Sequence, residues 1–213
     1  MVKCSNETQN DKAASGLFRI ETLKLGQIRE LYAERLTQDF PPDELKPLSR
    51  IERALKRGEY VCYGATDAGS ILAYAFFVVA GNQALFDYFA VAEDLRGRGI
   101  GSRFLRALIE DILADMDTVL LEVDDPGCAD SVEEASLRTR RLAFYLRNGL
   151  SDTGVTAEIY HVFFRILSLP VGRKPSQEKI RRVYAGLYRR ILPENLFSRY
   201  VVIHGPQGSF AAD

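Results

Sequence analysis

Three glycines stand within five residues of the stretch LRGRGIGSRF, residues 95–104, and arginine separates the first two. Glycine weakens an ordered segment unless its missing side chain is needed, so this cluster calls for a physical reason. A helix that starts here leaves its first backbone N–H groups unpaired, and its dipole adds roughly half a positive charge. Glycine lets a phosphate approach such a backbone, and Arg96 and Arg98 add charge-assisted hydrogen bonds. The stretch therefore predicts a phosphate-binding turn.

Three phosphate-binding patterns compete for this turn. A dinucleotide-binding G-x-G-x-x-G would need glycine where the chain has Ser102 or Phe104. A P-loop would need a lysine between glycine and serine, and Gly101-Ser102 lacks it. The third pattern is R-x-x-G-x-G, with Arg96, Gly99 and Gly101 in its fixed positions. A plain strand-to-helix turn without a ligand is the alternative that the glycines alone leave open.

The elements around the turn follow from hydrophobic periodicity. Apolar residues at helical spacing from Ile100 to Met116, with Arg103 and Arg106 opposite, predict a long amphipathic helix after the turn. Before it, runs separated by DAGS and AGNQ predict three strands joined by hairpins. The predicted strands are 17–23, 60–66, 71–79, 84–92, 118–123, 158–169 and 200–203, and further helices are predicted from 26, at 48–57, at 131–148 and at 180–191. This order predicts a mixed α/β fold.

Two motifs, in order along the chain, resemble those of a known family. FAVAEDLRGRGIGSRFLRALIED, residues 89–111, resembles the pyrophosphate-binding motif Q/R-x-x-G-x-G/A of the GNAT superfamily, the acetyl-CoA-dependent N-acyltransferases. RLAFYLRNGL, residues 141–150, resembles the A-x-x-F-Y-x-x-x-G-F segment of that family, with Arg141 and Leu150 as departures. The resemblance covers about residues 17–169 and implies a central, mostly antiparallel twisted sheet flanked by helices. A C-terminal helical extension has no counterpart in the minimal fold.

The resemblance implies a site for acetyl-CoA as co-substrate. Backbone N–H groups near the start of the helix would hold the pyrophosphate, and the implied residues are Arg96, Gly97, Arg98, Gly99, Ile100, Gly101 and Ser102. The backbone near Val91 would pair with the pantetheine arm and orient the thioester carbonyl. Because Gly99 holds a required position of the motif and Gly97 a variable one, Gly99→Val should abolish CoA binding and Gly97→Ala should be tolerated.

Acyl transfer from a thioester to an amine makes three chemical demands. The amine must lose a proton, the carbonyl oxygen needs a hydrogen-bond donor as it gains charge, and the thiolate leaves more readily when protonated. Tyr145 matches the family tyrosine commonly assigned as general acid for the thiolate. The alternative for Tyr145 is a half-buried aromatic side chain that packs beside Phe144.

Two carboxylates compete for the proton of the amine. Strand alternation places Asp87 with Leu85, Phe89 and Val91, on a face where desolvation would make it a stronger base. Glu122, on the predicted strand 118–123, is the other candidate. Either could instead bind the substrate ammonium while water takes the proton, or pair with an arginine. The acidic residues that follow could steer a cationic amine or simply be solvated: Asp124, Asp125, Glu133 and Glu134.

Composition and charge exclude other classes of protein. Among 213 residues there are 28 basic and 29 acidic side chains, so no general field favours nucleic acid or an anionic membrane. The longest apolar stretch, ILAYAFFVVA, is too short to cross a bilayer. The three cysteines and two histidines show no disulfide framework and no metal-ligand spacing, which favours a reducing, cytoplasmic setting without a metal.

These observations lead to one interpretation and one alternative. We expect a disordered tail at 1–15, a GNAT-like acetyltransferase domain at 16–170, and an extension of a helix and a short strand at 171–213 packed on it. The resemblance implies transfer of acetyl to a primary amine of a small molecule or peptide, by direct attack in a ternary complex. The alternative is a non-catalytic CoA-binding module that acts as a sensor or interaction protein. The apolar stripe of the last helix could also serve a homodimer contact.

Overall fold

The chain divides into two compact units, which we describe separately. Residues 18–42, 44–169 and 174–205 are described in a computed structural model, so the tail expected at 1–15 lies outside them. The first unit comprises Met1–Asn82 and Phe86–Ala114, and the second comprises Gln83–Leu85 and Asp115–Asp213. No helix among the described residues is long and apolar enough to span a membrane.

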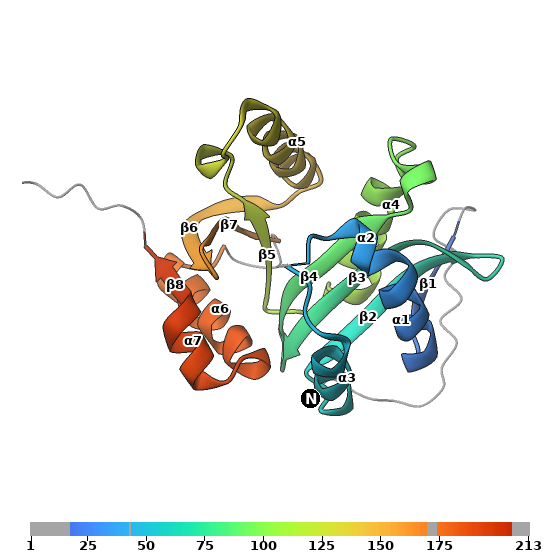
Figure 1. The fold of residues 1–213 in the computed structure, drawn as a ribbon, viewed down its shortest axis with the longest axis horizontal. Helices are drawn as coiled ribbons and strands as arrows, with labels where there is room; N and C mark the ends of the chain where they lie inside the picture. The colour runs from blue at the N-terminus through green and yellow to red at the C-terminus, as the bar shows by residue number, and fades with distance from the viewer. Residues whose placement is uncertain (1–17, 43, 170–173, 206–213) are drawn as a thin grey trace, which may run out of the picture. The chain divides into compact units, whose positions relative to one another are not determined.

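The first unit is built on strands in the order β1-β2-β3-β4 (Figure 1). Their bounds are Arg19–Thr22 for β1, Tyr60–Asp67 for β2, Ser70–Ala80 for β3 and Gln83–Val91 for β4. The pairs β1/β2 and β2/β3 are antiparallel. The turn between β2 and β3 places Ala68 and Gly69 at positive φ, where the DAGS pattern predicted a hairpin. Most of β3 is buried, which agrees with its nearly continuous apolar sequence.

Helices cover both faces of these strands. Before β2 come α1 Leu25–Leu31, a π-helical turn Tyr32–Leu36, α2 Thr37–Asp39 and α3 Leu48–Lys56; after β4 come a 3-10 turn Glu93–Leu95, α4 Ile100–Ala107 and a π-helical turn Leu108–Ile112. Tyr74 of β3 hydrogen-bonds to Asp39 of α2, whereas Phe89 of β4 stacks on Phe104 of α4 with 5.7 Å between ring centroids. The helices before β2 and helix α4 therefore cover opposite faces (Figure 1).

The second unit has antiparallel strands in the order β5-β7-β6-β8. Its elements are β5 Thr118–Asp124, α5 Val132–Arg147, β6 Ser151–Ile159, β7 Val162–Ser168, α6 Gln177–Ile191, α7 Glu194–Tyr200 and β8 Val201–His204. Helix α5 begins after Ser131, whose hydroxyl accepts from Glu134 N–H at 3.1 Å, as the capping pattern predicted. The predicted mixed α/β fold, with mostly antiparallel strands and a C-terminal helical extension, is confirmed.

The single strand predicted at 158–169 is wrong. The chain instead forms two antiparallel strands, β6 and β7, joined by a tight turn at Tyr160 and His161. Both residues adopt positive φ, 48° and 70°, a conformation that such turns usually assign to glycine or asparagine. Helix α7 was also missed. The extension reaches the sheet through β8, in which His204 pairs with Thr156 of β6.

Candidate active site

The glycine turn has the backbone of an anion site. Gly97 and Gly99 both lie in the left-handed region, at φ 76° and 78°. Gly99 is the N-cap of α4, and the backbone N–H of Arg103 donates to its carbonyl at 3.1 Å. The N–H groups of Ile100, Gly101 and Ser102 precede the first helical hydrogen bond, so they have no acceptor within the helix. The structure thus places amides without a helical acceptor and the positive end of a helix dipole after β4 and the short 3-10 turn that follows it.

Arg103 adds a cation that was expected on the polar face of α4. Its Nη2 donates to the carbonyl of Arg98 at 3.1 Å, and the same atom lies 4.0 Å from where a Cβ on Gly99 would stand. Its Nε is buried and has no hydrogen-bond partner in the described part of the chain. A guanidinium close to the first amides of α4 suits an incoming pyrophosphate. Periodicity could not reveal this, because the turn determines where the side chain folds back.

Arg96 is bonded to two groups of the same unit. Its Nη2 contacts Asp39 Oδ1 at 2.6 Å, and its Nε donates to the carbonyl of Val91 at 3.1 Å. Arg96 and Val91, which are both expected at the cofactor site, are therefore in direct contact. A pyrophosphate that binds Arg96 must replace Asp39 as its anionic partner, or share the guanidinium with it.

Asp39 is a partner of Arg96 that the sequence did not reveal. Besides Arg96, it accepts a hydrogen bond from the hydroxyl of Tyr74 at 2.8 Å and lies 3.6 Å from Arg35 Nη2. A cavity of about 310 Å³ opens beside it, lined by Arg35, Gln38, Asp39, Ala92, Glu93, Asp94 and Arg96. A lone aspartate ahead of Phe40 carries no recognisable spacing, since two of its partners, Tyr74 and Arg96, come from β3 and from the glycine turn.

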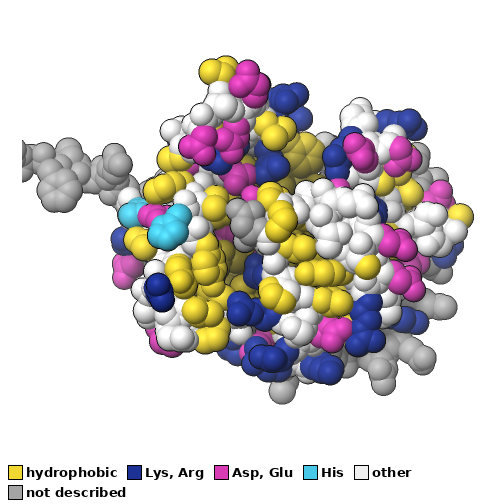
Figure 2. Space-filling model, in the orientation of Figure 1, with side chains coloured by type: hydrophobic (Ala, Val, Ile, Leu, Met, Phe, Trp, Pro, Cys, Tyr) yellow, Lys and Arg dark blue, Asp and Glu magenta, His cyan; other side chains and the backbone are white. Residues whose placement is uncertain are grey.

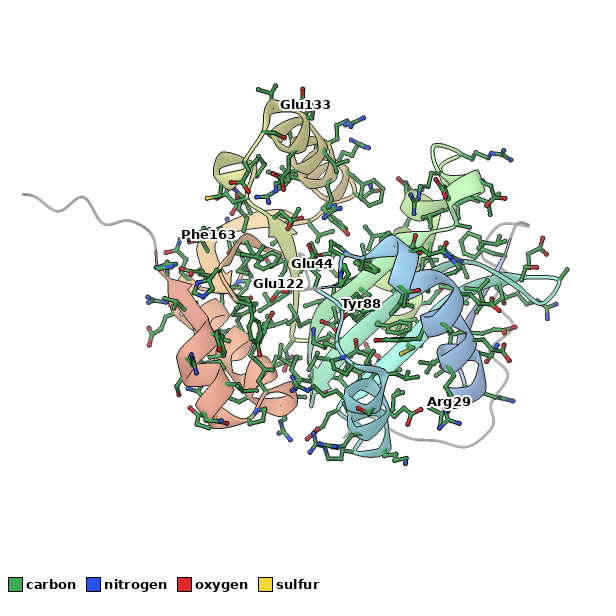
Figure 3. All side chains as sticks on the ribbon, viewed as in Figure 1. Arg29, Glu44, Tyr88, Glu122, Glu133 and Phe163 are labelled. Atoms are coloured by element: carbon green, nitrogen blue, oxygen red, sulfur yellow. The ribbon has the colours of Figure 1, made fainter. Side chains whose placement is uncertain are left out.

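Asp87 is held in an ion pair rather than left unpaired. Its Oδ1 lies 2.5 Å from Lys46 Nζ, its Oδ2 accepts from the hydroxyl of Tyr60, and its side chain is only 5% exposed. Lys46 belongs to the segment FPPDELKP, residues 40–47, and its backbone N–H donates to the Tyr88 hydroxyl at 2.8 Å. Tyr88 in turn donates to the carbonyl of Glu44 at 3.1 Å, and both are labelled in Figure 3. The segment is thereby anchored on β4.

The expected grouping of Asp87 with Phe89 on one strand face is wrong. Phe86 and Phe89 contact each other with 6.3 Å between ring centroids, although strict alternation would place them on opposite faces. Between them, Asp87 and Tyr88 both contact Lys46. Strand β4 does not alternate strictly here, as happens where a strand contains an extra residue. Asp87 therefore faces the FPPDELKP segment, away from Phe89.

Removing the lysine from this pair should destabilise the first unit. Lys46→Met leaves a buried carboxylate without its ammonium partner, which lowers the free energy of unfolding by about 3 kcal/mol. Urea denaturation of this variant and of the double variant Lys46→Met/Asp87→Asn measures the effect. The double variant should recover part of the loss because no charge stays buried. Equal stability of all three proteins would contradict this account of the pair.

Glu122 lies on β5 and is held by the C-terminal extension. The hydroxyls of Tyr184 and Tyr188, both on α6, donate to its Oε1, the second at 2.6 Å (Figure 3 labels Glu122). Both tyrosines lie on the apolar stripe of the helix predicted at 180–191, and this stripe is buried. Their hydroxyl contacts could not be foreseen because a period of 3.6 residues does not reveal what a stripe packs against.

Tyr145 is buried near the end of α5, with only 7% of its surface exposed. Its ring lies beside that of Phe144, at 5.2 Å between centroids, so the packing role considered from the sequence is present. Burial raises the pKa of Tyr145 to about 12, partly offset by the cation of Arg141. The phenol is therefore protonated at neutral pH, and a protonated phenol is what a proton donor to sulfur requires.

The acidic residues after Glu122 are largely neutralised by arginines. Asp124 contacts Arg141 at 2.5 Å and Asp125 contacts Arg165 at 3.1 Å. Glu134 pairs with Arg138 at 2.7 Å in the same helix. Figure 2 shows acidic side chains gathered over the start of α5. Glu133, which is labelled in Figure 3, lies there. Because arginines pair with three of the four carboxylates, these residues attract a cationic amine less strongly than their number suggests.

The expected site residues divide between the two units. Asp87, Val91 and the turn Arg96–Ser102 belong to the first unit, and the structure brings Arg96 and Val91 into contact. Glu122 and Tyr145 belong to the second unit. Within the second unit, Glu122 contacts α6 and Tyr145 lies on α5 beside the Asp124–Arg141 pair.

Comparison with known proteins assigns the family. The acetyltransferase (GNAT) family model matches residues 25–132, just over half of the chain. A GNAT-family acetyltransferase from Bacteroides thetaiotaomicron is similar in structure, with a TM-score of 0.63, 18% identity and coverage of 80% of this chain and 96% of its own. The ribosomal-protein-S18-alanine N-acetyltransferase from Escherichia coli has a TM-score of 0.54, 20% identity and coverage of 75% and 97%.

A Bacillus subtilis acetyltransferase in complex with CoA has a TM-score of 0.51, 16% identity and coverage of 72% of this chain and 98% of its own. At these identities the solved structures show the shared fold alone. A search of curated protein sequences gives no match. The family match covers the first unit's elements from α1 onward, the glycine turn and β5. The chain therefore belongs to the GNAT family of acetyltransferases.

Proposed function

We propose that this protein is an N-acetyltransferase that moves the acetyl group of acetyl-CoA to a primary amine by direct attack within a ternary complex. The observation that carries the proposal is the glycine turn, in which the N-terminus of α4, with amides that lack a helical acceptor, lies beside the guanidinium of Arg103. Membership of the family and the CoA bound to the Bacillus subtilis relative support it.

The chain's own residues bind the co-substrate in the first unit. Backbone N–H groups from Arg98 to Ser102 bind the pyrophosphate, and Arg96 joins them as it exchanges Asp39 for a phosphate oxygen. The backbone near Val91 binds the pantetheine arm. Acetyl-CoA supplies an acetyl group already activated as a thioester, so the protein must bind, orient and move protons.

Tyr145 and a carboxylate carry out the two proton transfers, to the leaving sulfur and from the attacking amine. Tyr145 is protonated at neutral pH and gives its proton to the departing sulfur. Glu122 is the better candidate to bind the amine or accept its proton, because the groups of α6 that donate to its Oε1 are hydroxyls and not an ammonium. Asp87 already binds the ammonium of Lys46, in the place that a substrate ammonium would take. Asp87 remains the second candidate, and it would require Lys46 to move away.

The direct test is ligand-dependent stability followed by an amine panel. At a CoA concentration one hundred times Kd, binding to the native state alone adds about 2.7 kcal/mol to the free energy of unfolding. For a chain of this length that raises Tm by roughly 5–10 °C, measured by differential scanning fluorimetry. An unchanged Tm at saturating CoA would contradict the proposal. Acetyl-CoA is then mixed with polyamines, amino acids, aminoglycosides and peptides, and thiol release is followed; binding without release favours the sensor.

A further inference from the structure

The C-terminal extension contributes two hydroxyls to one oxygen of Glu122. Tyr184 and Tyr188 stand four residues apart on α6, so their side chains lie on one helix face, with 4.9 Å between ring centroids. Both donate to Glu122 Oε1. Tyr184 is fully buried and Tyr188 is 5% exposed. Two aromatic side chains of the extension thus end on a single carboxylate of β5.

The position of these tyrosines is determined by contacts elsewhere in the second unit. Gln177, in the first turn of α6, donates through Nε2 to the carbonyl of Thr153 at 3.0 Å. The Ser176 hydroxyl caps the helix by accepting from the N–H of Lys179 at 3.2 Å. The extension then returns to the sheet as β8. The extension is thus anchored at the start of α6 and at β8, and a fixed α6 holds its hydroxyls in the geometry that a positioned carboxylate needs.

The charged groups on the other elements around β5 have partners of their own. On β7, Ile166 lies opposite Glu122, and the neighbouring Arg165 binds Asp125 and Asp152. On α5, Arg141 binds Asp124. The hydroxyls of Tyr184 and Tyr188 are contacts through which α6 acts on Glu122. Burial, together with the charge of Glu122, raises the pKa of Tyr184 well above its usual range, so this hydroxyl remains a donor.

We propose that Tyr184 and Tyr188 are positioning residues that hold Glu122 as an ionised carboxylate, ready to bind the protonated form of the amine substrate. Hydrogen bonds to a carboxylate favour its charged form, and a charged form selects a cationic partner. The extension is then part of the active site, and the acceptor is an amine that arrives as an ammonium ion. This inference rests on the proposed function and deepens it.

Phenylalanine substitutions remove the hydroxyls and keep the rings. Each of Tyr184→Phe and Tyr188→Phe should move the acidic limb of the kcat/KM profile up by about one pH unit, because a hydrogen bond to a charged group is lost. On that limb kcat/KM falls about tenfold, KM for the amine rises, and the affinity for CoA stays unchanged. Tyr200→Phe, on α7 of the same extension, is the matched control and should leave the profile in place.

A second variant separates positioning from general stability. In a Glu122→Gln background, Tyr188→Phe should have no further effect on kcat/KM, because the tyrosine acts through the carboxylate. Additive losses, or a pH profile that does not move, would overturn the proposal. ¹³C NMR of the labelled Glu122 carboxyl follows its titration without turnover. If the titration midpoint of Glu122 is the same in both phenylalanine variants as in the wild type, the proposal is also overturned. If the midpoint rises but the protein acetylates no amine, the positioning role stands and the proposed acetyltransferase function fails.

Discussion

Gly99→Val should abolish CoA binding, with a loss of affinity of roughly 100-fold or more. Gly99 adopts φ 78°, which a β-branched residue avoids, so valine would pull the backbone away and turn the first amides of α4 from the ligand. Two charge-assisted hydrogen bonds at about 1.5 kcal/mol each account for a loss of this size. Isothermal titration calorimetry with CoA measures it.

Gly97 offers a matched control for this substitution. Its φ of 76° is nearly the same as that of Gly99, and a Cβ there would meet no atom within 4 Å. Gly97→Val therefore introduces similar backbone strain at a variable position of the motif. Both valine variants should lose similar thermal stability, and only Gly99→Val should lose CoA binding. Equal losses of affinity would mean that the glycines serve the turn and not the phosphate.

The structure also changes the expectation for Gly97→Ala. From the motif alone, alanine at this variable position is expected to be harmless. The positive φ implies instead a loss of about 1 kcal/mol in the free energy of unfolding, because an L-residue is strained in the left-handed region. CoA affinity should still be retained, so stability and binding must be measured separately.

Tyr145→Phe should lower kcat by about 100-fold while leaving CoA affinity within a factor of about two, a loss typical of a missing general acid. The substitution keeps the ring, and with it the contact to Phe144, so a change in packing cannot explain the loss. Single-turnover measurements of acetyl transfer isolate the chemical step from product release. An unchanged kcat would assign Tyr145 to packing alone.

The pH dependence of the wild-type enzyme provides a second check on Tyr145. Its raised pKa, about 12, means that the phenol loses its proton only well above neutrality. A general acid is active in its protonated form, so ionisation of Tyr145 should not reduce kcat/KM between pH 7 and 10. A fall in kcat/KM between pH 7 and 10 that is absent from Tyr145→Phe would contradict this, because the phenol would then ionise at a much lower pH than its burial implies.

Local patterns were sufficient wherever a residue's neighbours along the chain decide its conformation. The glycine turn was predicted because Arg96, Gly99 and Gly101 stand at short fixed spacings, and the start of α5 because Ser131 and Glu134 form a cap. Hydrophobic periodicity likewise identified the buried stripe of α6. The turn at Tyr160 and His161 was missed, since tertiary contacts hold two non-glycine residues at positive φ against their local preference.

The sequence by itself determined the fold class, the glycine turn ahead of α4, and the choice of Tyr145, Asp87 and Glu122 as candidates. Only the tertiary structure decided which groups those candidates contact. It placed Lys46 on Asp87, Asp39 on Arg96, and Tyr184 with Tyr188 on Glu122. These pairs are separated by 41 to 66 residues along the chain. Their chemistry depends on burial and on hydrogen-bond partners, which no local spacing records.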